Sequence, residues 1–157
     1  MIVFKMKKIK TYLDRVIEKL LITIFGLMVI NVIWQVITRY FSENPSSFTD
    51  ELSRYLMIWL GILGAAYVTG KNEHVSIDFF IKKISVQNRK ILTLFITLSI
   101  ICFAIIALVI GGGRLVYITL ILQQYSPSLK IPLALVYSIL PISGILIIFY
   151  KITEIPK

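Results

Sequence analysis

Long apolar runs are the feature that most constrains how this chain can fold. A bilayer core about 30 Å thick is crossed by about 20 residues of α-helix. Apolar runs of that length cover residues 20–38, 91–113 and 131–150, and a shorter run over 55–70 reaches it if its helix begins near Ser47. The sequence therefore predicts four membrane-spanning helices.

The composition supports this interpretation. The chain has 157 residues, of which 57% are hydrophobic and only 16% charged, far from the average of a soluble domain. Strands could satisfy their backbone groups in lipid only as a closed barrel with alternating apolar and polar residues, and these runs are continuously apolar. We therefore predict an all-α membrane protein, a single membrane domain over residues 1–157, with spans at about 20–40, 48–70, 91–113 and 131–150.

The distribution of Lys and Arg predicts the orientation. Thirteen of the 17 lie in the first 19 residues, in the loop between the second and third spans, or in the tail, and four lie in the other two loops. Because cytoplasmic loops carry the excess of basic residues, both termini are expected in the cytoplasm. This distribution also accounts for the net charge of +9 without a nucleic-acid partner.

The sequence offers little material for catalysis or metal binding. A structural zinc site needs four Cys or His ligands and haem needs axial His or Met pairs, whereas this chain has one His and one Cys. Cys102 lies inside an apolar run, where an inert buried residue is the ordinary case. We expect no enzyme activity, no cofactor and no metal site on this chain.

The predicted spans also lack ionisable side chains. Asp, Glu, His or Arg at membrane depth is costly and usually serves proton or ion movement. None occurs within 20–38, 55–70, 91–113 or 131–150. This pattern disfavours a self-sufficient pump and favours a subunit that supports another protein.

Charged residues gather instead where the second span begins. Asp50 and Arg54 are four residues apart and Glu51 and Arg54 three apart, spacings at which side chains meet on a helix. Arg39 ends the preceding span at a similar depth, so the four charges could neutralise one another. The same residues would equally suit a solvated loop rim, and spacing alone leaves both interpretations open.

Two patterns on the first two spans predict helix contacts. Asn31, Gln35 and Arg39 recur every four residues, which gives a polar stripe that should face protein. On the second span, small residues that would let another helix approach closely occur at Gly61, Gly64 and Ala65.

The connecting segments are expected to lie on the membrane surface. Residues 76–85 combine an apolar face with a charged one at helical spacing, typical of an interfacial amphipathic helix that meets lipid headgroups. Residues 1–19 form a basic amphipathic segment. A helix over 91–125 would be too long for one span, so we expect a bend at the glycines 111–113 and an interfacial helix over 114–126.

One set of residues from the end of the first span to beyond the second forms a recognisable pattern: Arg39, Tyr40, Pro45, Glu51, Arg54, Trp59, Gly64, Ala65, Ala66, His74 and Asp78. With this pattern the sequence resembles the small, Q-type membrane subunit of tripartite ATP-independent periplasmic (TRAP) transporters. The resemblance covers roughly residues 20–94. It departs from the usual family pattern at Phe48, where tryptophan is common, and at Gly70-Lys71, where a small residue followed by arginine is common.

The resemblance implies a transporter of three proteins in a bacterial inner membrane. A periplasmic binding protein would capture an organic acid, and a large membrane subunit would carry the sodium and substrate sites and move as an elevator. This chain would brace the fixed scaffold of the large subunit. Arg39, Glu51 and Arg54 would then be structural or contact residues, and His74 with Asp78 would make local hydrogen bonds rather than handle protons.

Two other functions stay open at the level of the sequence. A small four-helix exporter would fit the size, but it should carry a membrane carboxylate in its first span, and residues 20–38 contain none. A membrane anchor for a peripheral enzyme would fit the topology, although the haem or quinone ligands such anchors often supply are scarce. The cargo is not encoded here, and sialic acids and C4-dicarboxylates both suit the family.

Overall fold

The computed structural model describes residues 2–41, 47–71 and 86–154. These residues are almost entirely helical, and the described part of the chain contains no strand. Four helices are long and apolar enough to cross a membrane, namely Lys8–Phe41, Ser47–Lys71, Ile91–Ile121 and Leu133–Thr153. The prediction of an all-α membrane protein with four spans is confirmed.

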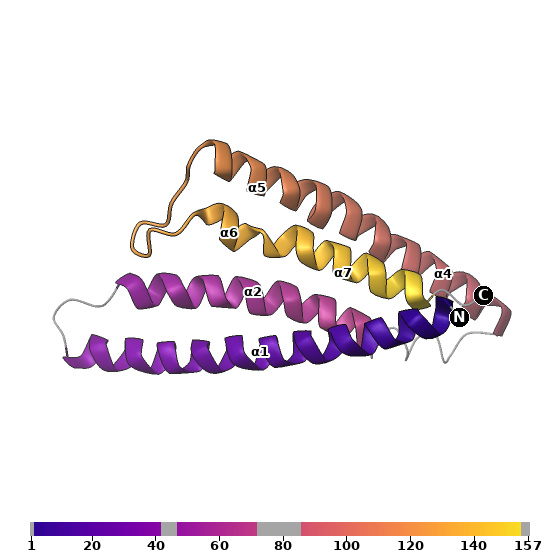
Figure 1. Ribbon diagram of the computed structural model, residues 1–157, viewed down its shortest axis with the longest axis horizontal. Coiled ribbons are helices and arrows are strands. Elements are labelled where there is room, and N and C mark those ends of the chain that lie inside the picture. The colour runs from indigo at the N-terminus through magenta and orange to yellow at the C-terminus, as the bar shows by residue number, and fades with distance from the viewer. Residues whose placement is uncertain (1, 42–46, 72–85, 155–157) are drawn as a thin grey trace.

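The helices lie side by side in one layer rather than around a common centre (Figure 1). Helix α1 packs along α2, α2 along α7, and α7 along the rod formed by α4, the π-helix η1 and α5. Both chain ends lie at one end of the layer, the termini end, and the connection from α5 to α6 lies at the other, the loop end (Figure 1). The bounds are α1 Ile2–Phe41, α2 Ser47–Lys71, α4 Val86–Phe103, η1 Ala104–Gly111, α5 Gly112–Ile121, α6 Leu133–Tyr137 and α7 Ile139–Glu154.

A single layer leaves little interior, so the buried side chains form two small clusters. One joins α1, α2 and α7 through Ile17, Leu63 and Tyr150. The other joins α2, η1 and α7 through residues that include Ala66 and Ala104, both with no exposed surface. Large apolar side chains elsewhere stay exposed, as expected where lipid rather than water surrounds the helices.

The expected bend at the glycine triplet was wrong. The backbone stays helical at Gly111 and Gly112, and α5 continues the rod to Ile121, so no separate helix covers 114–126 (Figure 1). Gly112 serves close packing instead, because a Cβ there would lie 2.7 Å from Leu140 Cβ. Lipid offers no water to compete for the helical hydrogen bonds, which helps the glycines stay helical.

The rod ends at a residue that the sequence did not mark as a helix stop. Gln123 takes a left-handed conformation with φ 47°. The Gln124 N–H donates to the Thr119 carbonyl at 3.0 Å and the Gln123 N–H donates to the Leu120 carbonyl at 3.1 Å. These are the two bonds of a Schellman motif, which usually places glycine where Gln123 stands.

Two further segments were predicted to lie on the membrane surface, residues 76–85 and residues 1–19. Residues 76–85 lie outside the described residues. The N-terminal segment continues without a break into the first span, because α1 runs from Ile2 to Phe41. At 1.5 Å per residue this helix is about 60 Å long, twice the thickness of a bilayer core.

The last span begins directly after Pro132 and is interrupted at Ser138, one turn before Pro141, whose ring nitrogen cannot donate a helical bond.

Another close contact between two long helices lies near the termini end. Gly70 of α2 faces the ring of Tyr150 on α7, and a Cβ on Gly70 would lie 2.8–2.9 Å from three ring carbons. The ring has nowhere to move, because Tyr150 is fully buried and its hydroxyl donates to Asp14 Oδ1 at 2.8 Å. This contact joins α1, α2 and α7 at one point.

We predict that Gly70→Ala destabilises the chain, because the added methyl overlaps the Tyr150 ring. Overpacking of this kind costs about 1–3 kcal/mol. The matched control is Gly61→Ala on the same helix, where nothing lies within 4 Å and alanine is the better helix former by about 1 kcal/mol. Thermal unfolding in detergent should show a lower midpoint for Gly70→Ala only. Equal midpoints for the two variants would contradict the packing account.

Candidate functional site

The N-terminal turn of α2 holds the loop that joins α5 to α6. Glu51 Oε2 accepts three hydrogen bonds, from the Ser126 hydroxyl at 2.5 Å, the Ser128 N–H at 2.9 Å and the Leu129 N–H at 3.0 Å. Hydrogen bonds to a carboxylate are about twice as strong as those between neutral groups. One side chain therefore ties together segments 75 or more residues apart.

The loop is shaped to receive this carboxylate. Its two arms pair where Ser126 N–H donates to the Ile131 carbonyl and Leu133 N–H donates to the Gln124 carbonyl. Between them the chain turns tightly, since the Lys130 N–H donates to the Ser126 carbonyl and Lys130 has φ 56°. The turn leaves two successive N–H groups, those of Ser128 and Leu129, facing Glu51, and such paired amides favour an anion.

The neighbouring acidic residue has a different role. Asp50 pairs with Arg54, with Oδ2 and Nη2 3.0 Å apart, and both side chains are more than half exposed. Its other oxygen accepts from Gln35 Nε2 at 3.2 Å. An exposed pair of this kind adds little stability, so its position matters more than its energy.

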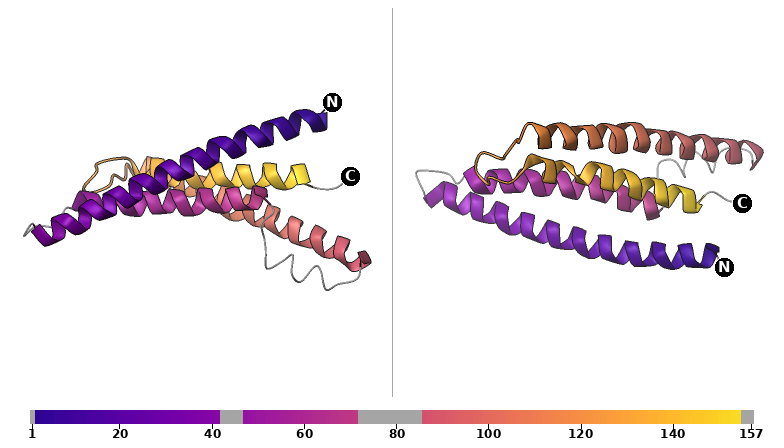
Figure 2. Two further views of the ribbon diagram at one scale, coloured as in Figure 1. Left: turned by 90° about the horizontal axis from the view of Figure 1, so that it is seen from below. Right: turned by 45° about the horizontal axis from the view of Figure 1, so that its top comes forward.

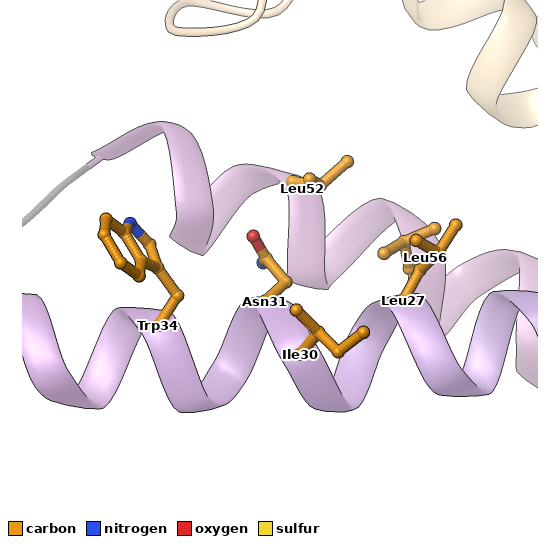
Figure 3. A pocket seen from close by; sticks show the side chains of 6 residues that line it. All are labelled: Leu27, Ile30, Asn31, Trp34, Leu52 and Leu56. Carbon is orange, nitrogen blue, oxygen red and sulfur yellow. The ribbon is translucent and has the colours of Figure 1, made fainter.

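The polar stripe on α1 was predicted to face protein, and its first two members, Asn31 and Gln35, do contact α2. Asn31 Nδ2 donates to the Thr49 carbonyl and to Ser53 Oγ, both at 2.7 Å. Figure 3 shows Asn31 directed toward α2 inside an otherwise apolar groove of about 310 Å³. The groove is lined by Leu27, Ile30, Asn31, Trp34, Leu52 and Leu56.

The expected mutual neutralisation of four charges does not occur as a single cluster. Glu51 turns to the loop, and no ion pair joins it to Arg54 among the residues that the structure describes. Arg39 likewise forms no ion pair with a described acidic side chain. Arg39 and Tyr40 are exposed at the last turn of α1, so only the Asp50–Arg54 pair of the expected cluster is present.

Trp59 fastens the middle of α2 to the last span. Its indole Nε1 donates to the Val136 carbonyl at 3.0 Å. Val136 lies in the last turn of the short helix α6, where a helix leaves carbonyl groups without internal partners. The bond gives the Val136 carbonyl a hydrogen-bond partner next to the helix interruption at Ser138, so Trp59 has a structural role.

The predicted small-residue face of α2 is open in this chain. A Cβ added at Gly61 or Gly64 would meet nothing within 4 Å, and Ala65 is exposed. Exposed residues recur along this face at helical spacing. We call it the open face of α2 and define it by Arg54, Met57, Gly61, Ala65 and Val68.

The contacts that join distant segments were not predicted from the sequence. Nothing local indicated that Ser126, which is 1% exposed, donates to Glu51, or that Gly70 packs against Tyr150. His74 and Asp78, which the sequence singled out, lie outside the described residues.

Residues 28–155 match the family described as tripartite ATP-independent periplasmic transporters, DctQ component. The chain belongs to the DctQ family. This places it among membrane subunits of transporters rather than among enzymes.

Relatives of this DctQ-family chain carry names that agree. A protein of Haemophilus influenzae named as a TRAP transporter small permease is 34% identical over 96% of this chain and 91% of its own length. The sialic acid TRAP transporter small permease protein SiaQ of Vibrio cholerae is 24% identical over 96% of this chain and 86% of its own length. The sialic acid TRAP transporter permease protein SiaT of Haemophilus influenzae is 32% identical over 52% of this chain but only 12% of its own length.

We predict that Glu51→Gln loosens the loop, because a neutral amide is a weaker acceptor for three donors. Hydrogen exchange of the Ser128 and Leu129 amides should accelerate by about tenfold or more. Asp50→Asn is the matched control, since it removes the neighbouring charge without touching the loop. The same acceleration in both variants would show that Glu51 has no special role.

Proposed function

We propose that this DctQ-family chain is the accessory membrane subunit of a sodium-coupled, binding-protein-dependent TRAP transporter that imports organic acids. In this role it braces the fixed scaffold of a large elevator-type permease. Substrate and sodium bind to the permease, and the periplasmic binding protein delivers the cargo. The match of residues 28–155 to the DctQ family carries the proposal.

A relative supports a large permease as the partner. The SiaT protein matches about half of this chain, yet the match is only 12% of its own length. A segment similar to this one therefore occurs within a much longer permease polypeptide. When a segment is fused to a permease in one protein, a separate chain similar to that segment is expected to bind a separate permease.

The open face of α2 supports a partner that packs on the middle of the layer. In lipid, helices associate through small residues that let backbones approach, because apolar side chains gain nothing over lipid tails. Gly61 and Ala65 present such a surface, and no other part of the described chain covers Gly61. The polar end of the same face carries Arg54.

Cargo and orientation complete the proposal. The SiaQ name of one relative favours sialic acid, and a C4-dicarboxylate is the alternative within the same class of acids. The excess of Lys and Arg on one side favours termini in the cytoplasm and an inner-membrane location. The loop end then faces the periplasm, where the loop held by Glu51 is available to the binding protein.

Reconstitution in vesicles tests the function directly. A sodium gradient should drive uptake of sialic acid or a C4-dicarboxylate only when this chain, the large permease and the binding protein are all present. Sodium-driven uptake by this chain alone would refute the accessory role. It would favour an autonomous carrier.

We predict that Gly61→Leu blocks assembly without disturbing this chain, because the new side chain fills the open face. Overpacking by about 1–3 kcal/mol corresponds to a loss of copurified permease of about fivefold to 150-fold. Gly113→Leu is the control, since Gly113 is equally free of neighbours but lies in the rod at the edge of the layer. Undiminished copurification of the Gly61→Leu variant would remove the open face from the interface.

A further inference from the structure

The N-terminal third of α1 carries three distinct stripes. With 100° per residue, Lys10, Asp14 and Ile17 fall on one side, which faces the layer. The opposite side is exposed and carries a stripe at helical spacing. We call it the basic stripe, and it consists of Lys8, Tyr12, Arg15 and Lys19.

The rotation of α1 about its axis is fixed by contacts with the layer. Asp14 accepts the hydroxyl proton of buried Tyr150, and the Lys10 ammonium lies 5.7 Å from the centre of the same ring. Ile17 is buried against Leu63 and Tyr150. Because these contacts hold the opposite side of α1 against the layer, the basic stripe points away from the protein.

An apolar stripe runs beside the basic one on a single flank. It contains Ile9, Val16 and Leu20, each between 40% and 43% exposed, while the acidic residues Asp14 and Glu18 lie on the other flank. Tyr12, 69% exposed, stands within the basic stripe. An apolar stripe next to cations and an exposed aromatic ring is the arrangement of a helix at the membrane surface.

The length of α1 brings these stripes to that surface. Only about 20 of its 40 residues are needed to cross the bilayer core. Figure 2 shows α1 diverging from the neighbouring helices toward its indigo N-terminal end. Lys8 and Lys19 are about 17 Å apart along the helix, a span that reaches several lipid headgroups.

We propose that the basic stripe of α1 binds anionic phospholipid headgroups, such as phosphatidylglycerol, at the membrane surface next to the chain termini. Cations attract these headgroups. Asp14 accepts the Tyr150 hydroxyl, and the exposed Glu18 lies on the flank opposite the apolar stripe, so neither acid stands within the basic stripe. The apolar stripe lies among the upper acyl chains. Lipid binding fixes the depth and tilt of α1, and with them the position of the layer in the membrane.

The test measures binding of a fluorescent phosphatidylglycerol to the purified full-length chain in neutral detergent. Arg15→Gln with Lys19→Gln should weaken binding about fivefold per removed charge, or about 25-fold together. The charge-preserving pair Arg15→Lys and Lys19→Arg should bind like the unchanged chain. Raising the salt concentration should weaken binding of the unchanged chain far more than that of the Gln pair.

The matched control removes two exposed charges at the loop end, Arg114→Gln with Lys130→Gln. It should retain full affinity for phosphatidylglycerol. Equal affinities of the unchanged chain and the Arg15, Lys19 pair would overturn the proposal, as would an equal loss in the control. If the stripe instead bound an acidic surface of a permease, the Arg15→Gln, Lys19→Gln variant would bind phosphatidylglycerol with unchanged affinity and would copurify less permease. The assay needs no permease, so its outcome is separate from that of the proposed transport function.

Discussion

Lipid removes the driving force that gathers apolar side chains into a core, and the arrangement of this chain follows from that constraint. Helices gain little by burying leucine against leucine when lipid tails are equally apolar. They are held by close glycine contacts and by a few hydrogen bonds between distant segments. Glu51 ties the α5–α6 loop, Trp59 ties α6, and Tyr150 joins α1 and α7 over Gly70.

A layer built this way has two broad faces and two edges, and most of its side chains meet the surroundings (Figures 1 and 2). Such a shape suits a subunit that lies against another membrane protein better than one that encloses a pathway of its own. The groove of about 310 Å³ around Asn31 lies between α1 and α2. The accessory role proposed for this DctQ-family chain relies on such an exposed layer.

The spans could be predicted from the sequence because length and hydropathy are local properties. The partner of Glu51 could not, since Ser126, Ser128 and Leu129 are 75 to 78 residues away and form their site only when the loop folds. The glycines show the same limit. The glycine triplet looked like a bend and instead packs closely at Gly112, whereas nothing near Gly70 in the sequence indicated its contact with Tyr150. A glycine's role depends on which helix lies opposite, and spacing within one helix does not contain that information.

The side chains of α2 point in three directions, and each side of the helix has its own contacts. Its residues toward α1 include Ser53 and Leu56, which meet the polar stripe and the apolar groove. Its residues toward the last span are Glu51, Trp59 and Gly70, which hold the loop, α6 and α7 in turn. The third direction is the open face. Because the first two sides already fix the helix in place, the small residues on the third are not needed for packing within the described chain. In the proposed function, their small size lets the backbone of a partner helix approach α2 from outside.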